Sequence, residues 1–363
     1  MKIAEILAWL ETLAHPSLQE SYDNAGLLTG DSSWDCSGII CTLDATEEVV
    51  NEAMEKKCNL IVAHHPIIFS GLKKINGKNY VEKTVIKAIK NDIAIYAIHT
   101  NLDNVVYGVN GKIAQLFGLV DTEVLMPKEV FRKLYAFVPA AKADEVRNAV
   151  FAAGGGHIGN YSECSFNIAG TGTFKAGSDT NPYVGKIGER HNENEVKVEI
   201  VFPQWLEGNV IRALKAAHPY EEVAFDIISL ANRFPQVGAG LVGNMAIPEM
   251  DNVFLEKIKA RFGVKMIRHT ALTGKLVRRV AVCGGAGSFL ISKALAAGAD
   301  AFVTADMKYH EFFDGNGRLL IADIGHYESE QFTTELLQEV LQQKFPNFAV
   351  LKTAVNTNPV HYG

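Results

Sequence analysis

Both ends of this chain alternate short, nearly continuous apolar runs with segments whose apolar residues recur at helical spacing. In the first section the apolar runs cover residues 38–44, 58–66 and 93–103. The helical segments that follow them are residues 45–57, 81–92 and 108–119. Strands that are apolar on both faces are typical of a parallel sheet with helices on either side. The pattern therefore predicts an α/β fold for this section.

The last section repeats the same pattern. Apolar runs cover residues 278–285, 300–307 and 317–326, and helical segments cover residues 288–299 and 328–345. The run IVAHHP of the first section corresponds to FVTADM of the last, and YAIHTNLD corresponds to LLIADIGHYE. We therefore expect two related α/β halves that form one metal-binding domain, because ligands in open α/β sheets collect at the carboxyl ends of strands.

The middle of the chain has a different pattern, with strands and helices in the order βαββαβ. This is the order of a ferredoxin-like fold, so an inserted ferredoxin-like domain is predicted at 126–232, between halves at 1–125 and 233–363. Turn-prone stretches at 118–129 and 231–240 mark its boundaries. A polar, Gly-rich stretch at 175–195 reads as an exposed loop or hairpin tip.

Composition excludes several classes of protein. The chain has 363 residues, of which 48% are hydrophobic, and a net charge of −6, which gives no general basic field for nucleic acid. Its five cysteines are odd in number and contain no CxxC pair, so a reducing compartment fits best. No run is long and apolar enough to span a membrane, and we expect a cytoplasmic protein.

Side chains of the metal-ligand type stand at the predicted strand and helix ends. They are His64 and His65 in HHP, His99 and Asp103 in HTNLD, Asp306 and His310 in TADMKYH, and His326 and Glu330 in GHYESE. His326 and Glu330 are four residues apart and share one helix face. Imidazole and carboxylate together suit Zn, Fe, Mn or Co, and a carboxylate can bridge two metals.

Each cluster also has a purely structural interpretation. A single buried His is more often a hydrogen-bonded core residue, Asp103 could cap a loop, and His326 with Glu330 could cap a helix. The adjacent pair His64 and His65 is harder to explain, because one of the two must point away from any single strand face. The comparable positions of all four clusters favour a metal site.

Two further stretches keep alternatives open. The Gly-rich CGGAGSFL, residues 283–290, could cradle a phosphate with its amides, although a tight turn is favoured because no Walker or dinucleotide fingerprint is present. Asp23 and Asn24 could line a pocket or cap a turn.

The combination YDNAGLL, HHP, HTNLD, TADMKYH and GHYESE resembles the dinuclear metal-centre hexameric proteins. These are also called GTP cyclohydrolase I type 2 homologues or NGG-interacting-factor-three-like proteins. The resemblance covers the whole chain and is specific to long bacterial members, whose insert is similar to trimeric signalling and copper-tolerance proteins; HPYEEVAFDI resembles the signature of that insert. The chain departs from the family at Tyr22, where Trp is frequent, and at Thr304–Ala305–Asp306, where TGD is common.

The resemblance implies that two divalent ions per subunit, with Zn favoured and Fe, Mn or Co as alternatives, bind a set of five ligands. They are His64, His65, Asp103, His326 and Glu330. It also implies a homohexamer whose metal sites face an internal cavity. The expected function is a hydrolase of the cyclohydrolase or amidohydrolase kind acting on a small molecule such as a nucleotide, with His99, Asp306 or His310 moving the proton.

A non-catalytic function is the alternative. A hexameric ring could serve as a regulator, a ligand sensor or a metal-handling scaffold, and the stretch 175–195 would then contact a partner or effector. DNA binding is disfavoured by the acidic balance and by the lack of a recognisable helix-turn-helix.

Overall fold

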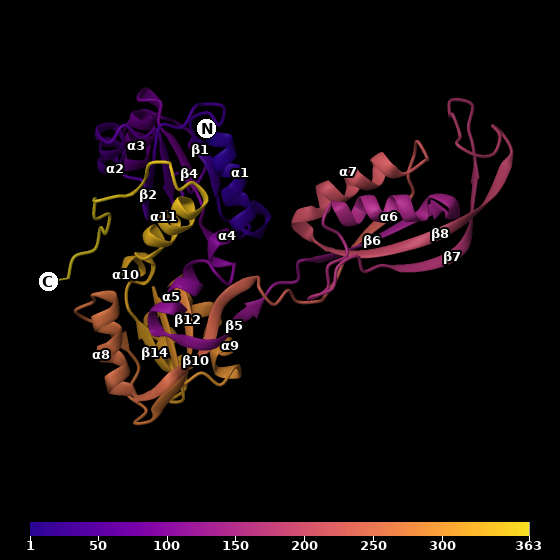
Figure 1. The fold of residues 1–363 in the computed structure, drawn as a ribbon. Coiled ribbons are helices and arrows are strands. Elements are labelled where there is room, and N and C mark those ends of the chain that lie inside the picture. The colour runs from indigo at the N-terminus through magenta and orange to yellow at the C-terminus, as the bar shows by residue number, and fades with distance from the viewer. Residues whose placement is uncertain (363) are drawn as a thin grey trace. The chain divides into compact units, whose positions relative to one another are not determined.

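The computed structural model describes residues 1–362 and divides into two compact units. The larger unit combines residues 1–127 with residues 235–362, and the smaller unit is Lys128–Phe234. Figure 1 shows the course of the chain through both. None of the helices in the described part of the chain combines the length and apolar character that a bilayer crossing requires.

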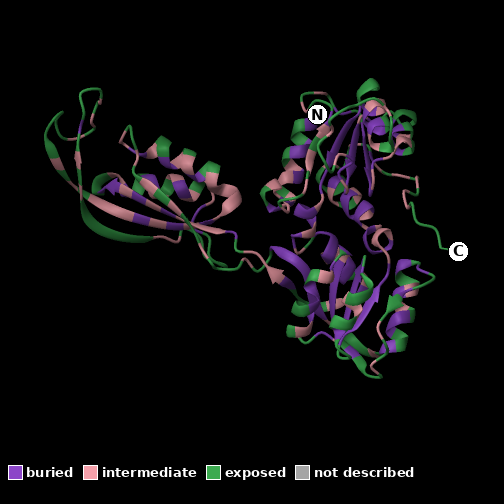
Figure 2. Ribbon diagram, turned by 180° about the vertical axis from the view of Figure 1, so that it is seen from behind, coloured by how far each residue is buried: buried purple, intermediate pink, exposed green. Residues whose placement is uncertain are grey.

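The first sheet of the larger unit has five strands in the order β1-β4-β3-β2-β15. They are β1 (Gly26–Thr29), β2 (Ile39–Thr42), β3 (Leu60–Ala63), β4 (Ala94–Ala97) and β15 (Val350–Lys352). Strands β15, β2, β3 and β4 run parallel, and β1 pairs antiparallel with β4. Every residue of β2, β3 and β4 is buried, as Figure 2 shows for the centre of this sheet.

The second sheet has six strands in the order β11-β14-β13-β12-β10-β5. They are β5 (Leu119–Pro127), β10 (Gly238–Met250), β11 (Arg268–His269), β12 (Leu276–Ala286), β13 (Ala301–Ala305) and β14 (Leu320–Asp323). Strands β12, β13 and β14 run parallel, like β2, β3 and β4 of the first sheet. The remaining three strands join antiparallel.

The helices of the larger unit cover both sheets. They are α1 (Ile3–Leu13), α2 (Glu47–Glu55), α3 (Tyr80–Lys90), α4 (Thr100–Asp103), α5 (Val109–Phe117), α8 (Asp251–Phe262), α9 (Ile291–Ala296), α10 (His326–Glu330) and α11 (Thr333–Lys344). Local sequence explains where they begin. In α2, for example, the Thr46 side chain accepts a hydrogen bond from the Val49 amide, and Val49, Val50 and Ala53 then face the core.

The two ends of the chain exchange elements between the sheets. Strand β15, from the C-terminal part, pairs with β2 of the first sheet, and β5, from the N-terminal part, pairs with β10 of the second. Helix α11 likewise packs on β2 and β15, whereas α5 packs on β10 and β12. Helices α5 and α10 contact each other and lie between the two sheets (Figure 1). The exchange ties both halves into one unit.

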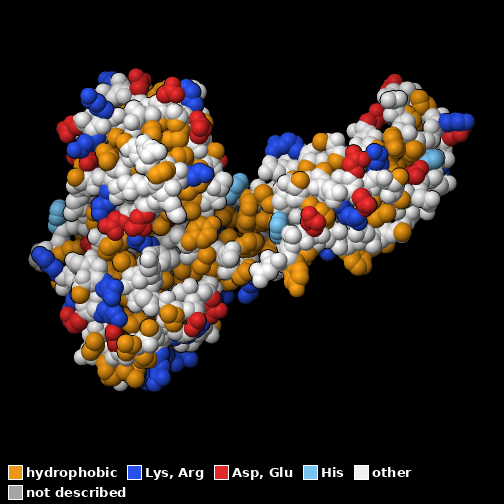
Figure 3. Space-filling view, in the orientation of Figure 1, with side chains coloured by type: hydrophobic (Ala, Val, Ile, Leu, Met, Phe, Trp, Pro, Cys, Tyr) orange, Lys and Arg blue, Asp and Glu red, His pale blue; other side chains and the backbone are white. Residues whose placement is uncertain are grey.

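The smaller unit is a four-stranded antiparallel sheet in the order β7-β8-β6-β9, with two helices. Its elements are β6 (Phe131–Pro139), α6 (Ala143–Ala152), β7 (Phe166–Lys175), β8 (Arg190–Pro203), α7 (Glu207–Ala217) and β9 (Phe225–Ser229). It has a hydrophobic core of its own, which includes Leu134, Phe202 and Leu214. In Figure 3, Lys and Arg side chains are interspersed with Asp and Glu side chains on the visible face of each unit.

Three sequence expectations differ from the structure. The turn-prone stretch 118–129 contains all of β5 and the stretch 231–240 contains the start of β10, because backbone pairing of these strands prevails over the local Gly and Pro signals. Strand β8 begins at Arg190, inside the expected loop, since its polar start pairs with β7 and both faces remain largely exposed there. The helix expected at 288–299 begins as a 3-10 turn at Ser288–Leu290 before α9.

Candidate metal centre

Three strand ends and two short helices bring the ligand-type residues of the larger unit together. His64 and His65 directly follow β3, and Asp103 ends α4, which begins three residues after the last residue of the neighbouring strand β4. His326 and Glu330 begin and end α10, which follows β14 of the second sheet. The cluster therefore lies where the carboxyl ends of the two sheets face each other.

The Glu330 carboxylate is the centre of the cluster. Its Oε2 atom lies 2.9 Å from His65 Nε2, 3.2 Å from His326 Nε2 and 3.9 Å from His64 Nε2. The Nε2 atoms of His65 and His326 are 3.4 Å apart, and Asp103 Oδ1 lies 3.6 Å from His64 Nε2. Three imidazoles thus direct the same nitrogen towards one carboxylate oxygen.

The opposite nitrogen of each imidazole has its own partner. His64 Nδ1 lies 2.9 Å from the Ile98 carbonyl oxygen, to which it donates. His65 Nδ1 is 2.7 Å from Asp44 Oδ1, and His326 Nδ1 is 2.6 Å from Asp306 Oδ2. Such partners fix the ring orientation and leave Nε2 to face a metal, an arrangement that most metal-ligating histidines show.

The protonation states in the metal-free protein follow from these contacts. Burial lowers the pKa of His64 to about 3, so this imidazole is neutral. Burial also disfavours charge on His65 and His326, but their carboxylate partners outweigh it and raise the pKa values to about 10 and about 11. Burial acts to raise the pKa of Glu330, yet hydrogen bonds from His326 and His65 hold it well below its usual range.

Two atoms of the cluster lack a hydrogen-bond partner in the described part of the chain. His64 Nε2 and Asp103 Oδ1 are both buried and unsatisfied. Burial and the Glu330 charge raise the pKa of Asp103 well above its ordinary value. Because unpaired buried polar groups are costly, and because a divalent cation would satisfy both atoms, the donor set fits a metal.

Within the described residues, three groups of side chains offer ligand atoms close enough to share an ion. They are His64 with Asp103 and Glu330, His65 with His326 and Glu330, and His64 with His65 and His99. In each group the ligand atoms lie within 4.8 Å of one another. Glu330 belongs to two of the groups, as a bridging carboxylate would.

A cavity of about 450 Å³ opens onto the cluster from one side. Tyr22, Phe69 and His99 are among its lining residues. His99 Nδ1 lies 2.8 Å from Asp23 Oδ1, while Asp23 Oδ2 accepts hydrogen bonds from the Thr100 amide and hydroxyl. Burial disfavours the charge of Asp23, but these partners lower its pKa to about 2. The carboxylate is therefore ionised and holds the His99 ring in place.

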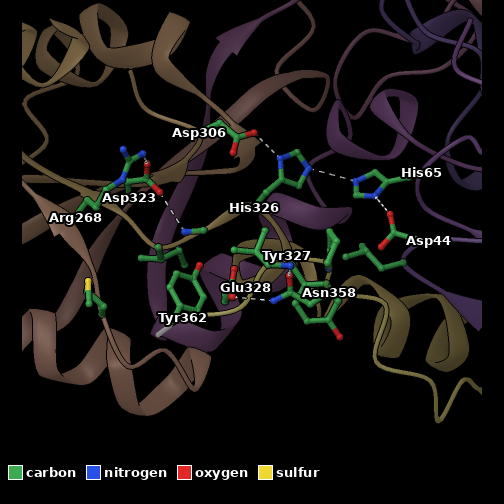
Figure 4. Close-up of a pocket in the computed structure, with 16 residues that line it drawn as sticks. Asp44, His65, Arg268, Asp306, Asp323, His326, Tyr327, Glu328, Asn358 and Tyr362 are labelled. Atoms are coloured by element: carbon green, nitrogen blue, oxygen red, sulfur yellow. Dashed lines mark hydrogen bonds and ion pairs between the residues drawn. The ribbon is translucent and has the colours of Figure 1, made fainter. Parts of the chain in front are cut away.

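A second cavity, of about 490 Å³, lies on the other side of His326 and shares Asp44, His65 and His326 with the first. Figure 4 shows the chain of contacts from Asp306 through His326 and His65 to Asp44 along its wall. The C-terminal segment closes its opposite side, where Asn358 Nδ2 donates to Glu328 Oε1 at 3.0 Å.

The three residues expected to move protons lie at different distances from the ligand cluster. His99 lines the 450 Å³ cavity beside the ligands, and Asp306, which does not line that cavity, contacts Nδ1 of His326. His310 is exposed and packs against the rings of Tyr309 and Phe313, and it lines neither cavity. It lies in the 3-10 turn Tyr309–Gly315 that follows β13.

Gly284 and Gly285, expected in a tight turn, instead lie at the end of strand β12, where they have a packing role. The Gly284 amide donates to Asn110 Oδ1 and the Gly285 amide to Ser329 Oγ, so both amides already have partners. Gly285 has φ +61°, and a Cβ there would approach Glu330 Oε1 to 2.5 Å. Glycine is therefore needed for the Glu330 carboxylate to occupy its position.

Sequence reasoning missed Asp44. This residue follows β2, the parallel neighbour of β3, so the rule that identified His64 and His65 could have identified it too. Its Oδ2 atom also accepts a hydrogen bond from the Thr357 hydroxyl in the C-terminal segment at 2.8 Å. No local sequence pattern predicts this contact.

Known proteins match this chain over nearly its whole length. The family described as Duf34/NIF3 (NGG1p interacting factor 3) matches residues 1–359. A protein named GTP cyclohydrolase 1 type 2 homolog from Halalkalibacterium halodurans is 39% identical over 371 residues, which cover 99% of each chain. One of the same name from Bacillus subtilis is 36% identical over 361 residues, covering 98% of this chain and 97% of that one.

Solved structures match as well. The crystal structure of a Bacillus cereus protein related to NIF3 has a TM-score of 0.82 and 38% sequence identity, and the match covers 100% of this chain and 99% of the other. The Staphylococcus aureus protein SA1388 has a TM-score of 0.79 and 29% identity over the same shares.

Proposed function

This chain belongs to the Duf34/NIF3 family, and from that premise we propose that it is a hydrolase that works with two divalent metal ions. The observation that carries the proposal is the convergence of three imidazole Nε2 atoms on Glu330 Oε2. An ordinary buried salt bridge needs one such partner, and it does not leave His64 Nε2 and Asp103 Oδ1 unpaired.

The ligand groups support one assignment of the ions. His64 and Asp103 would hold one ion, and His65 and His326 the other, with Glu330 shared by both. The carboxylate has two oxygens and a full negative charge, so it can bridge the ions and offset part of their repulsion. Zn²⁺ suits this mixture of nitrogen and oxygen ligands, as do Fe, Mn and Co.

When bound, paired divalent ions supply Lewis acidity and lower the pKa of a water molecule that they share. The chain itself supplies the proton carrier and the walls. His99 lines the cavity beside the ligands with Nδ1 held by Asp23, so its other nitrogen is available to take or give a proton. The rings of Tyr22 and Phe69, whose centroids are 6.3 Å apart, line the same cavity.

The names of the relatives suggest a nucleotide substrate, and GTP is the first to test. The 490 Å³ cavity beside His326 supports a nucleotide, since it is lined by Tyr327 and by Arg268, whose guanidinium also pairs with Asp323. An aromatic ring can stack on a base, and a guanidinium can bind phosphate. A base in this cavity would lie beside His65 and His326, which line both cavities, and hydrolysis would then occur at a ring carbon of that base.

The family resemblance also predicts two structural features, which we include in the proposal. The strand order of the smaller unit, with its two helices, supports a ferredoxin-like assignment for Lys128–Phe234. We also propose a homohexamer, which a sizing measurement tests directly.

The test pairs elemental analysis with turnover. Purified protein should contain about two divalent ions per chain and should turn over GTP, or another member of a panel of nucleotides, esters and amides, only when metal is present. Glu330→Gln keeps the shape of the side chain and should lose both metal and turnover. The matched control Glu256→Gln changes an exposed surface ion pair and should alter neither.

Two results would contradict the proposal. One is metal at background level in protein purified without chelators. The other is turnover that survives both chelation and Glu330→Gln, because hydrolysis would then not depend on this cluster.

A further inference from the structure

A further cavity lies within the smaller unit. It measures about 300 Å³ and is formed where the end of β7 and the following loop meet the segment between α7 and β9. All of its lining residues belong to Lys128–Phe234. The cavity is at the lower end of the size range of small-molecule sites, which fits a compact head group.

Three aromatic rings surround this cavity. The centroid of the Tyr220 ring is 5.8 Å from that of Phe174 and 6.3 Å from that of Tyr183, with interplanar angles of 61° and 53°. The rings are thus steeply inclined to one another and form walls instead of a stack. Ring faces carry the negative part of the aromatic quadrupole, and rings so arranged attract a cation between them.

Carboxylates complete the lining. Glu195, Glu221 and Glu222 line the cavity, and Lys175 is the one cationic side chain among the described lining residues. The Tyr220 hydroxyl donates to Glu195 Oε1 at 3.0 Å, and the other oxygen of Glu195 lies against Gly172. A Cβ at Gly172 would come within 2.0 Å of that oxygen, so glycine makes room for the charge.

The walls are held by buried contacts. His218 is 6% exposed; its Nε2 donates to the Phe137 carbonyl oxygen at 3.0 Å, and its Nδ1 accepts from the Tyr220 amide at 3.1 Å. This fixes the backbone that carries the Tyr220 ring. Glu221 Oε1 accepts from the Asn181 amide at 2.9 Å and so ties the long loop to the same wall. The HPYEE sequence therefore builds the cavity.

We propose that this cavity binds a small organic cation, of the alkylated ammonium class, between its aromatic rings. The rings supply cation–π attraction and the carboxylates balance the charge. An inorganic divalent ion fits less well, because ring faces are not ligands and the groups able to share an ion in the described chain all lie in the larger unit. The proposal does not depend on the metal centre.

The test uses the full chain and two probes of equal shape. Choline carries a trimethylammonium group, and 3,3-dimethyl-1-butanol replaces that group with a neutral tert-butyl group. Calorimetric titration should show saturable choline binding, with the neutral probe about tenfold weaker or more. Matched sodium chloride controls for ionic strength.

Variants locate the site. Tyr183 is 53% exposed, so Tyr183→Ala removes one wall without disturbing the core, and it should weaken choline binding about fivefold or more. Glu222→Gln should weaken choline but not the neutral probe. Tyr161→Ala, at a 76% exposed ring of the same unit outside the cavity, is the control and should change nothing.

Three results would overturn the proposal. The first is equal affinity for both probes, which would mean a merely apolar pocket, and the second is no binding of either. The third is a concentration-dependent association of the chain that Tyr183→Ala abolishes, because the rings would then contact a second copy instead of a ligand.

Discussion

The carboxylates behind His65 and His326 give the sharpest test of the metal centre. Asp306→Asn removes the charge that His326 Nδ1 contacts at 2.6 Å but keeps an oxygen that can accept. Asp306 has φ +55°, a conformation that asparagine tolerates better than most residues, so the backbone should be preserved. Loss of such a supporting partner weakens metal binding about 10–100-fold, or about 1.4–2.7 kcal/mol.

The structure also predicts which ion is affected. His326 shares a ligand group with His65 and Glu330, whereas the other ion would depend on His64 and Asp103. Titration of Zn²⁺ against a competing fluorescent chelator should therefore show one site weakened and one site close to wild type. Asp44→Asn acts on His65 in the same group and should weaken the same site.

A control and a refuting result complete this test. Asp314→Asn changes an exposed aspartate in the nearby 3-10 turn and should leave both sites unchanged. Global stability should change by less than about 0.5 kcal/mol in Asp314→Asn, since this side chain is exposed. Equal weakening of both sites by Asp306→Asn, or of neither, would refute the assignment of ligands to separate ions.

Further predictions concern pH, packing and the Gly-rich end of β12. In chelator-treated protein, the raised pKa values of His65 and His326 mean that their stabilisation is complete below pH 6.5 and is lost as pH rises towards about 10. Urea unfolding at pH 6.5 and 9.5 should show this decline, while Zn²⁺ affinity increases over the same range because ligands lose protons. Phe254→Ala should cost about 3–5 kcal/mol of unfolding free energy, measured in urea, because this ring is fully buried against Phe117. Gly285→Ala should reduce the amount of bound metal found by elemental analysis, because the new Cβ would displace Glu330. The melting temperature should change little by comparison.

Much of this site could be predicted from the polar residues that follow buried strands. His64 and His65 follow a wholly buried strand, and Asp103 ends the short helix after its parallel neighbour, so parallel pairing brings the two segments to the same sheet edge. The helical spacing of His326 and Glu330 likewise places both on one face of α10. Such positions can be predicted from the side-chain periods of helices and strands, which are visible in a short stretch of sequence.

Features that depend on distant pairing could not be predicted in this way. His310 stands beside Asp306 in sequence, yet the chain turns into a 3-10 segment after β13 and leaves it exposed. Strands β5 and β10 contain Gly and Pro signals that are typical of turns, and they form strands because β5 pairs with β10 and β10 pairs in turn with β12. The contact of Thr357 with Asp44 joins residues 313 apart and has no local signature.

Contacts between residues far apart in sequence also explain how the smaller unit can stand between the metal ligands in the chain. His65 and Glu330 are 265 residues apart, so their contact closes a very long loop. The smaller unit lies within that loop, but the chain leaves and re-enters at one place, where the Phe234 amide donates to the Lys128 carbonyl oxygen and β5 pairs with β10. Because closure entropy grows only with the logarithm of loop length, taking this unit out of the loop would change the cost by only about 0.5 kcal/mol. The unit's own core supplies its stability, so the metal centre and the aromatic cavity can each vary without disrupting the fold of the other.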